Sequence, residues 1–147
     1  MSKQAVVTAV VQSGYRVEVN AREHRFVMDQ PAQGGGQDEG PTPLEYVLGA
    51  LAGCFATLGR IIAHQQKITL HGMSMRFVGD YDPAGLLGRD ESVRPGFAQI
   101  RAEVDIDAEL DQAGKQALLA AIERRCPLVD NLLHGTALDV QLAAPPA

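Results

Sequence analysis

Two cysteines are the residues of this chain best suited to chemistry. Cys54 lies in the longest apolar run, residues 46–59, and Cys126 stands in the motif Arg124-Arg125-Cys126-Pro127. Their wide separation in sequence fits neither a CxxC redox motif nor a zinc knuckle. We expect one thiol beneath apolar walls and the other among cations at the start of a helix. This arrangement suits two thiols that react with a small molecule and then with each other.

The surroundings of Cys126 favour its nucleophilic form. Pro127 suits the first position of a short helix that Gly135 would end, so Cys126 is the predicted N-cap. The helix dipole and the two preceding arginines favour a thiolate there. A buried cysteine that packs as a small apolar residue is the alternative.

A reactive Cys54 would require a cation from another element of the fold. An internal, apolar position on a helix should raise the pKa of its thiol and make it unreactive. A cation must then reach it from another element, although each available arginine also fits a solvated strand position. The candidates on the opening strands are Arg16, Arg22 and Arg25.

Other kinds of site find little support. The four histidines have no metal-ligand spacing, and no P-loop, GxGxxG or GxSxG motif is present, so we expect neither a metal nor a cofactor. The net charge of −5 and the absence of a Lys/Arg run argue against nucleic acid. The opening residues lack an extended apolar segment, and residues 46–59 are too few to span a bilayer, so a cytoplasmic protein without a membrane role is expected.

The pattern of elements predicts an α+β fold with a largely antiparallel sheet in a single domain of 147 residues. Thr42, Pro43 and Glu45 form a capping box for a helix that extends to about Gln65 and is apolar all round. Its small residues suggest tight core packing or a helix crossing at a dimer centre. We also expect strands at residues 5–11, 15–19, 24–28, 68–78, 97–106 and 136–142, loops at 31–43 and 79–95, helices at 111–125 and 128–133, and a frayed tail at 143–147.

Three motifs together resemble the OsmC/Ohr family, which comprises osmotically induced protein C and the organic hydroperoxide resistance proteins. They are Gly40-Pro41-Thr42-Pro43-Leu44-Glu45, Leu51-Ala52-Gly53-Cys54-Phe55, and Cys126-Pro127-Leu128-Val129 followed by Leu138-Asp139-Val140. Their order and spacing cover nearly the whole chain. The resemblance implies an intertwined homodimer with antiparallel sheets around two long central helices.

The resemblance also implies a thiol-dependent peroxidase. Cys54 matches the cysteine that attacks the peroxide and becomes a sulfenic acid, and Cys126 matches the one that condenses with it to a disulfide. A dithiol or a lipoylated protein would be the reductant. The family pairs an activating arginine, here Arg16 or Arg25, with a glutamate ten residues before the helix cysteine. That position is Leu44 in this chain, and Glu45 matches another common glutamate.

These observations lead to one expected function and one alternative. The first is reduction of organic hydroperoxides, favoured over hydrogen peroxide because the helix around Cys54 is apolar. The second is a non-catalytic stress protein that binds an apolar ligand on the same fold, which the substitution at Leu44 supports.

Overall fold

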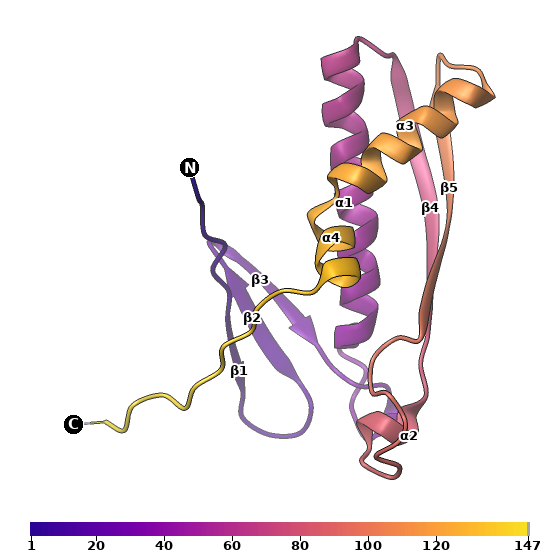
Figure 1. Ribbon diagram of the computed structural model, residues 1–147. Helices are drawn as coiled ribbons and strands as arrows, with labels where there is room; N and C mark the ends of the chain where they lie inside the picture. Colours follow the sequence, from indigo (N-terminus) through magenta and orange to yellow (C-terminus); the bar gives the residue numbers. More distant parts are fainter. Residues whose placement is uncertain (147) are drawn as a thin grey trace. The chain divides into compact units, whose positions relative to one another are not determined.

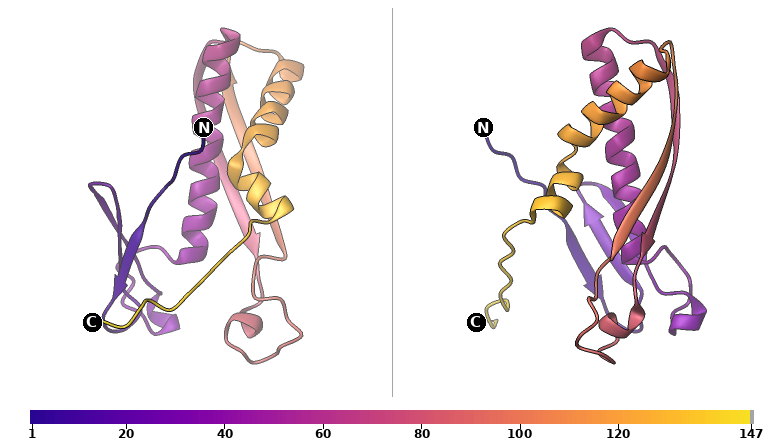
Figure 2. Two further views of the ribbon diagram at one scale, coloured as in Figure 1. Left: turned by 60° about the vertical axis from the view of Figure 1, so that its left-hand side comes forward. Right: turned by 45° about the vertical axis from the view of Figure 1, so that its right-hand side comes forward.

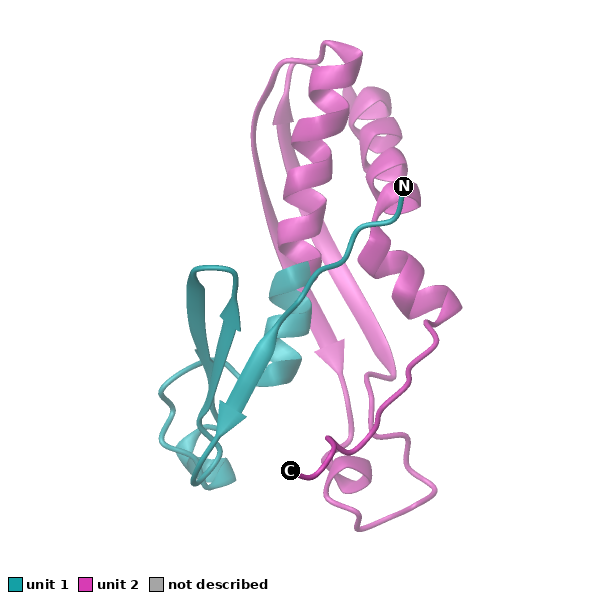
Figure 3. Cartoon of the chain, turned by 90° about the vertical axis from the view of Figure 1, so that its left-hand side faces the viewer, with its two compact units in different colours: residues 1–50 teal, residues 51–147 magenta. Residues whose placement is uncertain are grey.

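The computed structural model describes residues 1–146, and the chain divides into two compact units (Figure 1, Figure 3). The first unit is Met1–Ala50 and the second begins at Leu51. Helices and antiparallel strands occur together, which confirms the expected α+β class. The long helix α1 (Pro43–Gln66) contributes its first residues to one unit and the remainder to the other.

The first unit opens with the predicted antiparallel meander. Its sheet has the order β1 (Thr8–Val11), β2 (Val17–Ala21) and β3 (His24–Met28). Strand β1 begins later than its valines indicate. Arg22 adopts φ 56° in the tight connection between β2 and β3, a conformation uncommon for a residue with a Cβ.

The buried carboxylate of Asp29 organises the glycine-rich loop that follows the meander. Asp29 is 1% exposed, and it accepts hydrogen bonds from the backbone amides of Gln30 at 2.7 Å and Glu39 at 3.2 Å. A Cβ at Gly36 would collide with the Gln30 carbonyl, so only glycine permits this close approach. The end of the loop, which includes the short 3-10 helix η1 (Ala32–Gly34), is therefore held against the residues at the start of the loop.

The start of α1 has the predicted capping box. The Glu45 amide donates to Thr42 Oγ1 at 3.2 Å, and the Thr42 amide donates to Glu45 Oε1 at 2.9 Å. One residue later, the Tyr46 hydroxyl donates to the Val27 carbonyl at 2.9 Å and its ring packs on Phe26. These contacts fix the first turn of the helix against β3.

The second unit is built on a long hairpin. Strand β4 (Leu70–Asp80) pairs antiparallel with β5 (Gln99–Ala108), and their connection contains the short helix α2 (Pro83–Leu86) where we expected only loop. Helices α1 and α3 (Gln112–Arg125) lie beside the hairpin in two further views (Figure 2), and the apolar side chains of the hairpin pack on them. The core is formed by Phe55, Leu58, Ile62, Ala63, Leu70, Ile106, Leu118, Ala121, Ile122 and Cys126.

One close approach joins α1 to the hairpin. Gly59 is buried, and a Cβ built there would lie 2.5 Å from Met73 Sδ and 3.6 Å from Ile122 Cδ1. Four residues earlier, Phe55 meets Phe77 of β4 edge to face, with ring centroids 5.3 Å apart. The α1 face that carries both residues is thereby fixed against the sheet.

Helix α1 is buried on one side only: Val47 is 40% exposed and Ile61 41%, because one chain supplies a single layer to cover it. One expectation from the sequence is wrong. Residues 136–142 form no strand, and Leu138 is 87% exposed. Within residues 1–146, this segment has no neighbouring strand to satisfy its backbone hydrogen bonds.

Helix α1 is long and apolar enough, by length and composition, to cross a membrane. The core helices of soluble proteins meet the same criterion, and part of α1 belongs to such a core. The Arg60 guanidinium of α1 donates to the backbone carbonyls of Leu70 and His71, and these hydrogen bonds hold its charged side chain against β4.

Candidate functional site

The structure brings the two cysteines together. The sulfurs of Cys54 and Cys126 lie within hydrogen-bond distance, 3.3 Å apart, and both residues are reduced. Cys54 comes from the middle of α1, and Cys126 from the junction of α3 with α4 (Pro127–His134). Because the sulfurs already touch, a small displacement suffices to reach the bonded S–S distance of about 2.05 Å.

The predicted N-cap fixes the position of Cys126. Its sulfur accepts a hydrogen bond from the Val129 amide at 3.5 Å, and Pro127 occupies the first turn of α4. The preceding helix α3 is capped by the Asp111 carboxylate, which accepts from the Gly114 amide at 2.8 Å. Cys126 is only 1% exposed, whereas Cys54 is half-buried. Cys54 is thus the more accessible of the two sulfurs.

The electrostatics of Cys54 disfavour a freely ionised thiol. Burial raises its pKa to about 11, and the neighbouring Cys126 contributes to the rise. The backbone amide of Leu128, in the first turn of α4, lowers the pKa of Cys54 and so opposes this effect. The sequence-based expectation that the apolar helix raises this pKa is confirmed.

The arginines next to Cys126 lie on the surface. The guanidinium of Arg125 donates to the side-chain oxygen of Gln65 at 2.8 Å, which links the ends of α3 and α1. Arg124 is also exposed.

The other predicted site residues belong to the first unit. Arg16 forms ion pairs with Glu18 at 2.9 Å and with Glu39 at 2.5 Å, and these carboxylates raise its pKa. Arg25 is exposed on β3 and has no ion pair among residues 1–146. Glu45 serves in the capping box, and hydrogen bonds from Thr42 lower its pKa.

Two groups near the candidate residues were not predicted from the sequence. Glu39 binds Arg16, and nothing in its local sequence indicates this long-range contact. The Leu128 amide could have been found, because the first amides of any helix lack partners within the helix.

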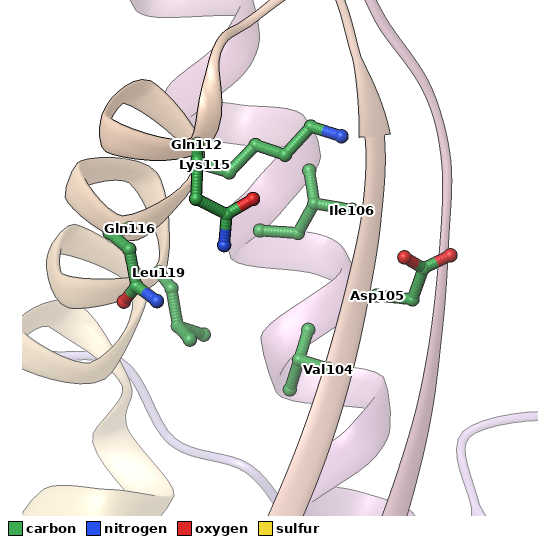
Figure 4. Close-up of a pocket in the computed structure, with 7 residues that line it drawn as sticks. All are labelled: Val104, Asp105, Ile106, Gln112, Lys115, Gln116 and Leu119. Atoms are coloured by element: carbon green, nitrogen blue, oxygen red, sulfur yellow. The ribbon is translucent and has the colours of Figure 1, made fainter.

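A small cavity lies apart from the cysteines. It has a volume of about 110 Å³ and opens between β5 and α3 (Figure 4). Leu119 and Ile106 supply its apolar wall, while the ammonium group of Lys115 extends across it (Figure 4). Among residues 1–146, no cluster of three His, Cys, Asp or Glu side chains could hold a metal ion.

Comparison with known proteins places this geometry in a family. The family model described as "OsmC-like protein" matches residues 35–141, which include both cysteines. A search of curated proteins found no match. The OsmC-like protein of Mycoplasma pneumoniae is 20% identical, with a TM-score of 0.77 over 90% of this chain and 89% of that one.

Two further solved structures share the fold. The organic hydroperoxide resistance protein OsmC of Legionella pneumophila is 20% identical, with a TM-score of 0.66 and coverage of 90% and 91% of the two chains. The organic hydroperoxide resistance protein OhrB of Bacillus subtilis is 20% identical, with a TM-score of 0.58 and coverage of 89% and 91%. Since the family match spans most of the sequence and the fold agrees, this chain belongs to the family of OsmC-like proteins.

Proposed function

We propose that this protein reduces organic hydroperoxides, with Cys54 as the attacking thiol and Cys126 as the resolving thiol. The observation that carries the proposal is the hydrogen bond between the two sulfurs, 3.3 Å apart. Solved relatives named as organic hydroperoxide resistance proteins support the same class of activity. Because Cys54 is the more accessible sulfur, it is the one that meets the substrate.

The chemistry proceeds in three balanced steps. The Cys54 thiolate attacks one peroxide oxygen, the O–O bond breaks, and the alkoxide leaves and takes up a proton to become an alcohol. The sulfenic acid then condenses with the Cys126 thiol, which forms the disulfide and releases water. A dithiol, free or as a lipoyl group on a protein, reduces the disulfide and is itself oxidised to a disulfide.

The proposal extends to the substrate, the cellular location and the activating cation. The apolar residues packed around Cys54 favour organic hydroperoxides over hydrogen peroxide. A cytoplasmic location would keep both thiols reduced between turnovers. Arg16 is the favoured activating cation, since two carboxylates hold its guanidinium in one position, while Arg25 lacks such support.

The proposal includes a homodimer. The face of α1 that one chain leaves open carries Val47 and Ile61, and no atom lies within 4 Å of a Cβ built at Gly49 or Gly53. A second copy that packs its own α1 there would cover this face. Sedimentation equilibrium at micromolar concentration should give twice the chain mass, and a monomer would contradict the dimer.

The test compares three proteins after one equivalent of cumene hydroperoxide. The wild type should lose two hydrogens in intact mass and give a Cys54–Cys126 peptide on mapping. Cys126→Ser should stop at a sulfenic acid on Cys54, which dimedone traps. Cys54→Ser should leave the peroxide unconsumed.

The same mass measurement would also show that the peroxidase proposal is wrong. An unchanged wild-type mass would favour a non-catalytic protein that binds an apolar ligand, an alternative supported by Leu44 in place of the usual glutamate and by the raised pKa of Cys54. Wild-type turnover in Cys54→Ser would show that the attacking residue is misassigned.

A further inference from the structure

One hydrogen bond ties the last residue of α3 to the last turn of α1. The guanidinium of Arg125 donates to Gln65 Oε1 at 2.8 Å, although the two residues are 60 positions apart in the sequence. Within residues 1–146, it is the only side-chain hydrogen bond between these two helices. Cys126 follows Arg125 directly, so the hydrogen bond holds the residue next to the second thiol.

This hydrogen bond adds a constraint that the apolar core does not supply. Leu58 and Ile62 of α1 share a core cluster with Leu118 and Ile122 of α3. Burial of apolar surface is non-directional, whereas a hydrogen bond from a planar guanidinium requires a defined length and direction. The link from α3 to α1 therefore fixes an orientation between two helices that are otherwise joined by apolar contacts.

The end of α3 is attached to α1 at two separate points. One is the contact of 3.3 Å between the sulfurs of Cys126 and Cys54, and the other is the hydrogen bond between Arg125 and Gln65. Gln65 lies eleven residues after Cys54 on the same helix, which is about 16 Å along its axis. Two points this far apart fix the angle at which the chain meets α1, whereas the sulfur contact alone would leave it free to pivot.

Cys126 depends on its neighbours for its position. It lies between the two helices α3 and α4 with an extended backbone, φ −74° and ψ 115°. On the side of α4, the Val129 amide donates to its sulfur at 3.5 Å. On the side of α1, the hydrogen bond from Arg125 to Gln65 anchors the adjacent residue.

We propose that Arg125 and Gln65 are positioning residues, which hold Cys126 within reach of Cys54 for the second chemical step. The proposal rests on the peroxidase function above. Neither positioning residue exchanges a bond: the Cys54 sulfenic acid gives up its hydroxyl, Cys126 gives up its proton, the S–S bond forms and water leaves. Arg125 then acts through geometry, whereas its place in the sequence suggested an action through charge.

Thiol–disulfide exchange tests the positioning without peroxide. Oxidised glutathione converts the protein dithiol to the Cys54–Cys126 disulfide and releases two molecules of reduced glutathione, and the equilibrium constant gives the effective concentration of one thiol at the other. Arg125→Met and Gln65→Met should each lower this value about threefold, the low end expected for one hydrogen bond, because both side chains are exposed. The double variant should lose no more than either single variant, because the two residues act as a pair.

Arg124→Met is the matched control for the lost charge. Arg124 is exposed at the same end of α3 and has neither an ion pair nor a side-chain hydrogen bond within residues 1–146. Its substitution removes the same charge near Cys126, so the effective concentration should keep its wild-type value. A loss equal to that of Arg125→Met would assign the effect to charge and overturn the proposal.

The acceptor has a conservative variant of its own. Gln65→Glu keeps an oxygen at the same place and adds a charge that strengthens a hydrogen bond from a guanidinium. The effective concentration should therefore equal or exceed that of the wild type. A fall to the value of Gln65→Met would show that the contact with Arg125 is not what matters, and the proposal would be wrong.

The reaction with cumene hydroperoxide separates positioning from a general disturbance of the site. In Arg125→Met, the sulfenic acid should form on Cys54 at the wild-type rate, while its condensation with Cys126 should be about threefold slower. Dimedone should then trap a larger share of the sulfenic acid than in the wild type or in Arg124→Met. An equal slowing of both steps would overturn the positioning role.

The two proposals fail in different ways. If the wild type forms no sulfenic acid but Arg125→Met lowers the effective concentration as expected, the peroxidase proposal fails and the positioning role stands as a property of the thiol pair. If peroxide oxidises Cys54 but the effective concentrations of Arg125→Met and the wild type are equal, the positioning role fails and the peroxidase stands.

Discussion

Two glycines of α1 allow the gain in helix propensity from glycine to alanine to be separated from the cost of overpacking. Gly59→Ala adds a methyl group where a Cβ would lie 2.5 Å from Met73 Sδ, and Gly53→Ala adds one where no atom of the chain lies within 4 Å. Both positions are in the interior of the same helix. They therefore share the propensity gain from glycine to alanine, which is about 1 kcal/mol.

The difference between the two variants isolates the packing cost. At Gly59, the Met73 sulfur must retreat by roughly 1 Å or more to restore an ordinary contact of about 3.5–4.0 Å. Overpacking of this kind costs about 1–3 kcal/mol. Gly59→Ala should then be neutral or destabilising by up to about 2 kcal/mol, whereas Gly53→Ala should stabilise the single chain by about 1 kcal/mol.

Urea denaturation at several protein concentrations measures both effects. The two free energies of unfolding should differ by about 1–3 kcal/mol, with Gly59→Ala the lower. If Gly59→Ala instead gained as much stability as Gly53→Ala, the close approach of α1 to β4 would be refuted. A loss at Gly53→Ala that shrinks as the protein is diluted would show that a second copy packs on this face, because dilution favours the single chain, which the substitution stabilises.

Three further predictions follow from the first unit. Asp29→Asn should speed protease cleavage within the glycine-rich loop, because an amide cannot accept both backbone hydrogen bonds. Although burial opposes the effect, hydrogen bonds from backbone amides lower the pKa of Asp29 in the folded protein. The carboxylate therefore stabilises the loop fully above its ordinary pKa of about 3.9, and this stabilisation is lost as the pH falls through the lower pKa of the folded state. The rate of protease cleavage in the loop, measured as the pH is lowered, should rise over this range. Thr42→Ala should lower the free energy of unfolding by about 1 kcal/mol through loss of the cap, and Thr42→Ser, which keeps the hydroxyl, should not. Arg16→Gln should slow sulfenic acid formation while Arg25→Gln does not, as measured by dimedone trapping; equal rates in both variants would remove Arg16 from the activation step.

Local sequence determined much of this protein. The capping box at Thr42 and Glu45 and the N-cap at Cys126 before Pro127 depend on groups within three residues of one another, and both were predicted. The strand predicted at residues 97–106 is present as β5, and its Ile106 is buried. Such features need no distant partner, so periodicity and residue type suffice to identify them.

Tertiary structure decided what distant segments do to one another. The contact between Cys54 and Cys126, the pairing of Arg16 with Glu39, and the exposed side of α1 each depend on how separate elements pack. Residues 136–142 alternate like a strand but form none, because a strand exists only beside another that accepts its hydrogen bonds. Sequence therefore indicated most of the elements and the residues that could react. The fold alone decided that the two sulfurs meet, because a contact across 72 positions is set by the packing of α1 against α3 and α4.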